Sequence, residues 1–218
     1  MEVTLIDSMG SDLTVVNAAR VSFAKESEWE SIPEGGQIEG LLSDGDERLI
    51  KYLAKHNHWS PFGHCSIQFR IKAPIFVARQ LVKHQVGLVW NEVSRRYVDD
   101  EPEFYIPKNW RLRPEGSVKQ GSSDETIEYN IHGTMQFMKQ TYYNLLREKV
   151  APEMARMVLP QNMYTEWYWS GTLMAFARVC NLRCAKDTQW ETQQIANKID
   201  EKCKDLFPNS WEALRNDE

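Results

Sequence analysis

The stretch KHQVGLVWNEVSRRY, residues 83–97, places polar and charged side chains on both sides of an apolar centre. A solvent-exposed loop has no need of Val86, Leu88, Val89 and Trp90 in its middle, because apolar side chains of this size are usually buried. A buried strand, in turn, does not favour the Ser-Arg-Arg sequence that follows. The combination predicts a segment that is partly packed in a core and partly available to a ligand.

The residues before this stretch predict a strand followed by a helix. Residues 64–74 alternate between apolar and polar side chains, as in a half-buried strand. Pro74 suits the first turn of a helix over residues 75–85, and Gly87 suits its end. The spacing from Trp90 to Val98 predicts an extended segment, in which Glu92, Ser94 and Arg96 would share one face.

The rest of the chain predicts a mixed α+β fold in which helices dominate around one sheet. The expected elements are a strand at residues 2–7, a helix at 46–56 capped by Ser43 or Asp44, a helix at 125–150, an aromatic-rich helix at 162–180, and a last helix after a Thr188–Glu191 capping box. The chain has no internal repeat or low-complexity tract, and its 218 residues are enough for one sizeable core or two small ones.

Composition excludes several classes of protein. The 26 basic and 31 acidic residues give a net charge of −5, which argues against a nucleic-acid-binding protein. No apolar run approaches the ~20 residues of a membrane span, and the N-terminus lacks a signal-peptide pattern, so we expect a cytoplasmic protein without a membrane partner. The four cysteines form no Cys-x-x-Cys pair, and we expect buried thiols and no metal site.

Several arginines lie among apolar neighbours in the sequence, where an unpaired charge is costly to bury. They are Arg79, Arg156, Arg178 and Arg183, with Arg95 and Arg96 in the opening stretch. Structural ion pairs are the ordinary explanation for each arginine alone. Together they favour a phosphate, whose oxygens match the guanidinium in bidentate geometry. The residues alone therefore predict binding of a phosphorylated, aromatic small molecule, and they leave the reaction open.

The opening stretch resembles the signature of the flavin-dependent thymidylate synthases, which is Arg-His-Arg, a short spacer and Asn-Glu-x-Ser-x-Arg-Tyr. His84 matches the centre of the first half, and Asn91, Glu92, Ser94, Arg96 and Tyr97 match the second half. Other segments that resemble the family are HNHWSPFGH (56–64), KAPIFVARQ (72–80), EFYIP (103–107), ARMVLPQNMYTEWYW (155–169) and NLRCAKDTQWETQQ (181–194). The resemblance extends over residues 44–211.

The resemblance implies a single α+β domain over residues 1–218, with a mainly antiparallel sheet packed by long helices. It also implies a homotetramer with FAD in active sites shared between subunits. The expected reaction is methylation of dUMP to dTMP, with carbon from methylenetetrahydrofolate and electrons from NADPH. Reduced flavin gives hydride to the nucleotide in this family, and no enzyme cysteine attacks the uracil ring.

The family's functional residues carry over to particular positions of this chain. Arg183 matches the arginine that contacts the pyrimidine and is the expected catalytic residue, through stabilisation of charge on the ring. The expected dUMP-binding residues are Gln80, Lys83, Glu92, Ser94, Arg95, Arg96, Arg156 and Arg183. The expected FAD-binding residues are Ser60, Lys83, His84, Gln85, Glu92, Thr172 and Arg178.

The chain also departs from the family pattern. Lys83 and Gln85 replace the outer arginines of the triplet, and the spacer between His84 and Asn91 is one residue longer. Lysine keeps the charge but loses the planar fork of arginine. Two alternatives therefore stay open, which are hydroxymethylation of a pyrimidine nucleotide on the same scaffold and a nucleotide-binding protein without catalysis.

Overall fold

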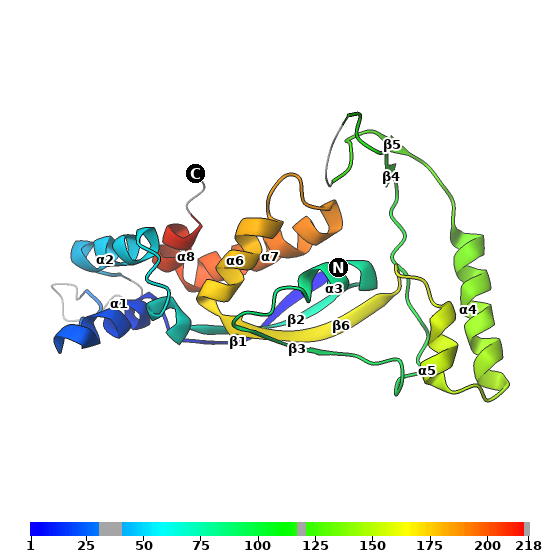
Figure 1. Cartoon of the computed structure of the whole chain (residues 1–218), viewed down its shortest axis with the longest axis horizontal. Helices are drawn as coiled ribbons and strands as arrows, with labels where there is room; N and C mark the ends of the chain where they lie inside the picture. Colours follow the sequence, from blue (N-terminus) through cyan, green and yellow to red (C-terminus); the bar gives the residue numbers. More distant parts are fainter. Residues whose placement is uncertain (31–40, 117–120, 216–218) are drawn as a thin grey trace.

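The computed structural model describes residues 1–30, 41–116 and 121–215 (Figure 1). At its centre lies a four-stranded sheet in the order β1-β2-β6-β3, in which every neighbouring pair is antiparallel. The strands are β1 (Glu2–Met9), β2 (Ser66–Pro74), β3 (Leu88–Glu92) and β6 (Tyr164–Thr172). The expected α+β fold with a mainly antiparallel sheet is confirmed.

Strand β2 follows the predicted alternation. Ile67, Phe69 and Ile71 are buried, whereas Gln68 and Arg70 point to the opposite face of the sheet. Both neighbours of β2 are long strands, which places this segment in the middle of the sheet.

Strand β6 corrects the prediction of one helix over residues 162–180. The segment Tyr164–Thr172 is a strand, and helix α6 occupies only Leu173–Arg183. Every second side chain from Thr165 to Trp169 is buried, which is the period of a strand. Aromatic and β-branched side chains fit such a pleated surface, and the prediction gave this signal too little weight.

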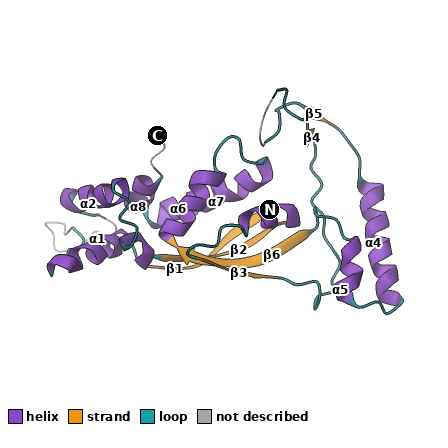
Figure 2. Cartoon of the chain, viewed as in Figure 1, coloured by secondary structure: helices purple, strands orange, loops and turns teal. Residues whose placement is uncertain are grey.

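One face of the sheet is covered by helices α3 (Ile75–Leu81), α6 and α7 (Trp190–Leu206), as Figures 1 and 2 show. Phe176 of α6 packs edge-on against Phe69 of β2 and Trp169 of β6, with ring centroids 5.1 and 5.3 Å apart. The core therefore lies between this helical layer and the sheet.

Helix α7 begins without the predicted capping box. Its N-cap residue is Gln189, and no side chain caps that end. Thr188 instead donates its hydroxyl to the carbonyl of Leu182 at 3.1 Å. Glu191 turns toward other side chains and becomes available to the site described below.

A second group of helices contact one another beside the sheet: α1 (Asp12–Arg20), α2 (Asp44–Lys55) and α8 (Pro208–Leu214). Ser43 caps α2, which confirms one of the two predicted caps. The remaining short 3₁₀ turns are η1 (Val21–Phe23), η2 (Pro61–His64) and η3 (Arg156–Val158).

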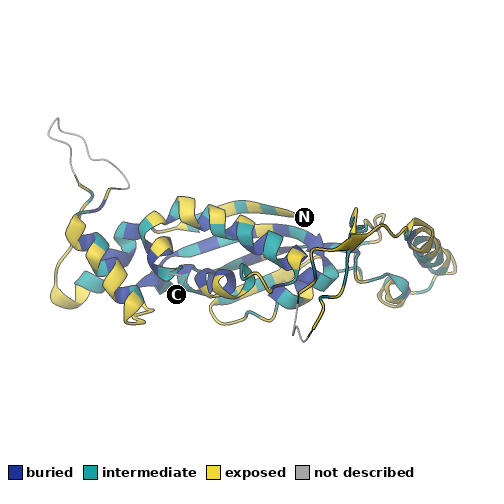
Figure 3. Ribbon diagram, turned by 90° about the horizontal axis from the view of Figure 1, so that it is seen from above, coloured by how far each residue is buried: buried dark blue, intermediate teal, exposed yellow. Residues whose placement is uncertain are grey.

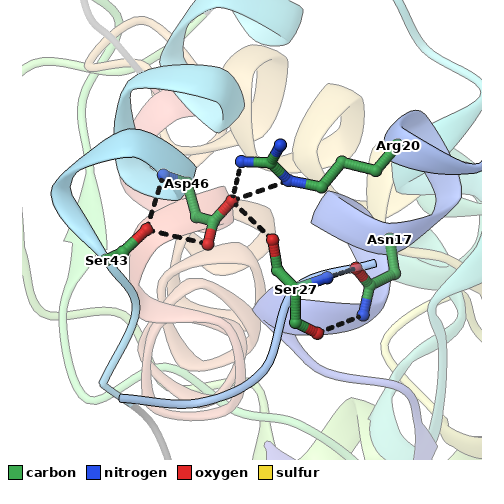
Figure 4. A network of polar contacts seen from close by, with 5 residues as sticks. All are labelled: Asn17, Arg20, Ser27, Ser43 and Asp46. Carbon is green, nitrogen blue, oxygen red and sulfur yellow. Dashed lines mark hydrogen bonds and ion pairs between the residues drawn. The ribbon is translucent and has the colours of Figure 1, made fainter. Parts of the chain in front are cut away.

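Asp46 of α2 connects these helices through a buried carboxylate (Figure 4). It accepts hydrogen bonds from the Arg20 guanidinium and from the hydroxyls of Ser27 and Ser43 at 3.0 and 2.9 Å. Asn17 in turn bonds the backbone of Ser27. Burial raises the pKa of Asp46, but the bonds from Arg20 and both serines outweigh it and hold the pKa below its usual value.

The segment predicted as a helix over residues 125–150 starts later in the structure. Residues Thr126–Ile127 form strand β5, which pairs with β4 (Trp110–Arg111). Helix α4 covers His132–Arg147 and is followed by the short helix α5 (Pro152–Ala155). The sequence also predicts a polar loop at residues 112–124, of which residues 117–120 lie outside the described residues.

Helices α4 and α5, with η3, form an arm beside the sheet rather than on it (Figures 1 and 3). Large apolar side chains of this arm are exposed, including Phe137 at 68% and Met157 at 71%. Apolar exposure on this scale is typical of an interaction surface. In the described part of the chain, no helix is both long and apolar enough to cross a membrane.

Candidate functional site

The stretch 83–97 forms a turn and a short edge strand. Helix α3 ends at Leu81, and β3 begins at Leu88. Gly87 lies between them with a φ of +75°, where a Cβ atom would meet the Ala175 Cβ atom at 3.1 Å and the Thr172 hydroxyl at 3.2 Å. The turn therefore packs tightly against the start of α6, and glycine meets both the steric and the conformational demand.

The extended segment predicted from Trp90 to Val98 is wrong beyond Glu92. The chain turns there, and the carbonyl of Ser94 accepts bonds from the amides of Tyr97 and Val98. Glu92, Ser94 and Arg96 therefore do not share the face of one strand. The Ser94 hydroxyl nevertheless accepts a bond from the Arg96 Nε atom at 3.1 Å.

Arg183, at the end of α6, is held by His84. Its Nε atom donates to the His84 Nε2 atom at 3.1 Å. Burial and the nearby Arg183 charge lower the pKa of His84, which keeps the imidazole neutral and able to accept this bond near neutral pH. Burial also lowers the pKa of Arg183, whose usual value is so high that the guanidinium stays charged.

Arg183 and Gln80 line the same cavity, whose volume is about 790 Å³. Its walls come from the core helices on one side and from the β4–β5 hairpin and the arm on the other. The lining residues are Phe76, Gln80, Tyr105, Pro107, Asn109, Trp110, Arg111, Gly121, Ser122, Ile131, Met135, Gln161, Asn162, Arg183, Gln189 and Glu191. A cavity with aromatic walls and a few converging polar groups suits a flat heterocyclic ligand.

Glu92, Arg95 and Arg156 line a second cavity of about 390 Å³. Glu92 accepts hydrogen bonds from Thr165 at 2.7 Å and from Trp90 at 3.1 Å. Three other carboxylates that line this cavity pair with cations, Glu101 with Lys139, Glu103 with Lys72 and Glu166 with Arg70.

The arginines of this second cavity bond backbone carbonyl groups. Arg95 bonds the backbone carbonyl of Asp100, and Arg156 bonds that of Glu153. Among the described residues, neither guanidinium forms an ion pair. Such arginines are suited to an anionic ligand.

The expected dUMP-binding residues therefore fall into two groups. Gln80 and Arg183 line the larger cavity, whereas Glu92, Arg95 and Arg156 line the second one. Lys83 lies before the Leu88 end of β3, which is called its first end below, and Ser94 and Arg96 follow its Glu92 end.

Most of the expected FAD-binding residues lie near the first end. The turn with Lys83, His84 and Gln85 packs on the start of α6, where Thr172 is the N-cap residue. Ser60 precedes η2, which contacts α6, and Arg178 is exposed on α6 itself. Glu92 again belongs to the other end.

Sequence reasoning assigned no role in the site to four residues that line the same cavity as Gln80, which are Tyr105, Arg111, Gln189 and Glu191. Glu191 is only 4% exposed and accepts bonds from Arg111 at 2.6 Å, Tyr105 at 3.2 Å and Gln189 at 3.2 Å. Gln189 accepts a bond from the Gln80 amide. Two of these residues belong to the segment Thr-Gln-Trp-Glu, residues 188–191, whose polar side chains we interpreted as a helix cap and not as part of the site.

Three of the four thiols are poorly suited to nucleophilic attack. Burial raises the pKa of Cys65 to about 12 and also raises the pKa of Cys180 and Cys203. In the described part of the chain, Cys180, Cys184 and Asp200 bring three possible metal-ligand atoms within 4.8 Å of one another. Asp200 already accepts bonds from Trp211 and Arg215 at 2.9 and 2.7 Å, which weakens its capacity as a ligand.

Known proteins match this chain over nearly its whole length. Residues 4–209 match the model of a family described as thymidylate synthase complementing protein. A flavin-dependent thymidylate synthase of Thermus thermophilus is 39% identical over 216 residues, which are 97% of this chain and 74% of that protein. The protein of the same name from Thermotoga neapolitana is 39% identical, over 97% of this chain and 89% of that protein.

Two solved structures are also similar to this chain over nearly its whole length. The crystal structure of the UMP/dUMP methylase PolB from Streptomyces cacaoi, bound with 5-Br dUMP, superposes with a TM-score of 0.80. It is 32% identical to this chain and covers 98% of this chain and 94% of its own. The structure of the same methylase bound with 5-Br UMP gives a TM-score of 0.76 at 30% identity, over 98% and 92% of the two chains.

Proposed function

The chain belongs to the flavin-dependent thymidylate synthase family, and we propose that it methylates dUMP to dTMP. Methylenetetrahydrofolate is the proposed carbon donor, and NADPH is the proposed source of electrons. The observation that carries the proposal is that the Arg183 guanidinium lines the same cavity as Gln80 and is held there by its hydrogen bond to neutral His84. Residues 1–218 act as one catalytic domain in this proposal.

Arg183 supplies positive charge where the reaction needs it. Loss of the proton from the uracil ring nitrogen puts negative charge on that nitrogen and on the ring oxygens, and it makes the ring a better nucleophile toward the carbon donor. A fixed guanidinium in a partly buried cavity stabilises that charge without reorganisation of solvent. His84 orients the guanidinium through its Nε atom and leaves both Nη groups available to the pyrimidine.

The state of the cysteines supports a route without a covalent enzyme intermediate. The thiols of Cys65, Cys180 and Cys203 are buried, and their pKa values are raised. A thiol in this state is not a nucleophile near neutral pH. These three thiols are therefore not the groups that activate the ring, and we assign that role to Arg183.

The residues near the first end of β3 fit FAD. Lys83 and Arg178 are exposed cations, and among the described residues neither forms an ion pair. We propose that they would hold the FAD pyrophosphate, with Ser60, Gln85 and Thr172 as hydrogen-bonding partners and His84 as a further contact. Bound FAD supplies the hydride that completes the methyl group.

We further propose that the active site is shared between copies of the chain in a homotetramer. Arg183 and Gln80 of one copy meet the base, while Glu92, Ser94, Arg95, Arg96 and Arg156 of another meet the sugar and phosphate. The separate cavities and the exposed apolar side chains of the arm support this arrangement. The unpaired Arg95 and Arg156 supply the charge that a phosphate needs.

Mass analysis of the nucleotide product tests the reaction. The purified protein is incubated anaerobically with dUMP, FAD, NADPH and methylenetetrahydrofolate, and with UMP in a parallel reaction. Formation of dTMP supports the proposal. A hydroxymethylated product would replace it with the first alternative, and unchanged dUMP with no bound flavin would favour a nucleotide-binding protein. Methylated UMP would widen the substrate class.

Co-expression of two inactive variants tests the shared site. Arg183→Ala and Arg156→Ala each remove one half of every site. In mixed tetramers, some sites combine the intact halves of both variants, so activity returns. Light scattering of the mixed and parent proteins measures the assembly. Mixed tetramers as inactive as both parents would mean that each chain builds its own site.

A further inference from the structure

Glu191 is a buried carboxylate that the proposed reaction does not use directly. It lies on α7, and its Oε1 atom accepts bonds from the Arg111 guanidinium at 2.6 Å and the Tyr105 hydroxyl at 3.2 Å. Burial raises its pKa, but the bonds and charge of Arg111 outweigh burial and hold the pKa below its usual value. Glu191 is therefore ionised and can only accept hydrogen bonds.

The second oxygen of this carboxylate starts a chain of side-chain amides. The Gln189 Nε2 atom donates to the Glu191 Oε2 atom at 3.2 Å. The Gln80 Nε2 atom donates to the Gln189 Oε1 atom, and the Thr192 hydroxyl donates to the Gln80 Oε1 atom at 3.1 Å. These contacts connect Glu191 to Gln80, which the proposed function places at the nucleotide.

A side-chain amide can turn over and exchange its oxygen and nitrogen, so its orientation depends on its partners. If Gln189 turned over, its oxygen would face the Glu191 carboxylate, and two acceptors would repel. If Gln80 alone turned over, its oxygen would face the oxygen of Gln189. Thr192 cannot decide the orientation, because a hydroxyl both donates and accepts.

We propose that Glu191 is a positioning residue that fixes the polarity of the Gln189–Gln80 relay, so that Gln80 meets the nucleotide with its amide in one orientation. The inference rests on the proposed function, because it takes dUMP to be the ligand that Gln80 contacts. Glu191 does not touch the nucleotide in this role. It acts through the two glutamines.

The isosteric substitution Glu191→Gln reverses the relay without removing its bonds. The amide oxygen of the substituted side chain still accepts from Arg111 and Tyr105, which directs the new NH₂ group toward Gln189. Gln189 then turns its oxygen to this NH₂ group and its own NH₂ group to Gln80. Gln80 must in turn face Gln189 with its oxygen. The donor and acceptor ends of the Gln80 amide are then exchanged toward the nucleotide.

Titration calorimetry of dUMP on the FAD-loaded protein tests this inference. Glu191→Gln should raise the Kd for dUMP by about tenfold or more, because one polar contact at a partly buried site is mismatched. The melting temperature should fall as well, because the ion pair with Arg111 is lost, so dUMP binding by the folded variant is the deciding measurement. The matched control is Asp200→Asn, a carboxylate-to-amide change on the same helix, whose oxygen bonds Trp211 and Arg215 and which lies outside both cavities.

A rescue variant separates the relay from a structural role. In Gln189→Glu/Glu191→Gln, the carboxylate moves next to Gln80, accepts from its NH₂ group and restores the original orientation. Its Kd for dUMP should return to within about threefold of the wild-type value, although the ion pair with Arg111 stays lost. A role limited to that ion pair predicts no recovery.

The inference would be overturned by a Glu191→Gln variant that binds dUMP as tightly as the wild type. It would also be overturned by a double variant that binds dUMP no better than the single variant. If Glu191→Gln does not fold, the double variant alone decides, and weak dUMP binding by it counts against the relay. Absence of dUMP binding by the wild type would instead overturn the proposed function and this inference with it.

Discussion

Replacement of Arg183 by alanine tests the centre of the proposed site. A unit charge ~4 Å from the guanidinium gains ~1 kcal/mol in water and ~4 kcal/mol at an effective dielectric constant of ~20. Arg183 is half-buried and lies at a cavity wall, so its contribution lies between these limits. We take ~3 kcal/mol, which corresponds to a kcat lower by roughly two orders of magnitude.

The assay measures kcat for dTMP formation together with the flavin bound per chain, read from visible absorbance. Flavin should stay bound in Arg183→Ala, because Lys83, Thr172 and Arg178 are unchanged. Arg183→Lys should give an intermediate kcat, since lysine keeps the charge but loses the planar donor group and the bond from Nε to His84.

Two results would refute this reasoning. A kcat within threefold of the wild-type value in Arg183→Ala would show that the guanidinium does not stabilise charge on the ring. Loss of all flavin in the same variant would show that Arg183 belongs to the cofactor site instead.

Three further predictions concern the surroundings of this site. Activity should fall on the acid side of pH 6.5, because protonated His84 cannot accept the bond from Arg183, and kcat measured at several pH values tests this. Because the pKa of His84 is lowered by folding, its contribution to stability is complete above pH 6.5 and declines as pH falls, which urea titrations at several pH values measure. Asp46→Ala should lower the free energy of unfolding by about 3 kcal/mol in urea, because it leaves Arg20 without its buried partner. Gln85→Arg should keep activity and tighten flavin binding in fluorescence titrations, whereas complete loss of activity would mean that the longer turn has rebuilt the site around Gln85.

The sequence predicted those parts of the fold in which the local period is unambiguous. β2 alternates over its whole length, and α2 and α3 carry clear start signals in Ser43 and Pro74. The segment from residue 162 to 180 was harder, because its aromatic residues suit both a helix face and a strand. Residues Tyr164–Thr172 form a strand because they pair with β2 and β3. Such long-range contacts cannot be seen in the sequence of the segment itself.

The site was predictable only as far as the family resemblance reached. Arg183 and Gln80 were expected near the nucleotide, and the structure brings both to one cavity. The contact between Arg183 and His84 was not predicted, because the two residues are 99 positions apart in the chain. The same is true of Arg111 and Glu191, which are 80 positions apart and meet only after the hairpin and α7 have packed.

The geometry also explains which part of the Arg-His-Arg pattern this chain keeps. His84 is half-buried and accepts the bond that orients Arg183, so its position requires a neutral acceptor of fixed shape. Lys83 and Gln85 on either side are exposed, and among the described residues neither forms an ion pair. Substitution at these outer positions changes the charge offered to the cofactor, but it leaves the support of Arg183 intact. The altered triplet is therefore expected to shift flavin affinity more strongly than the chemistry on the pyrimidine.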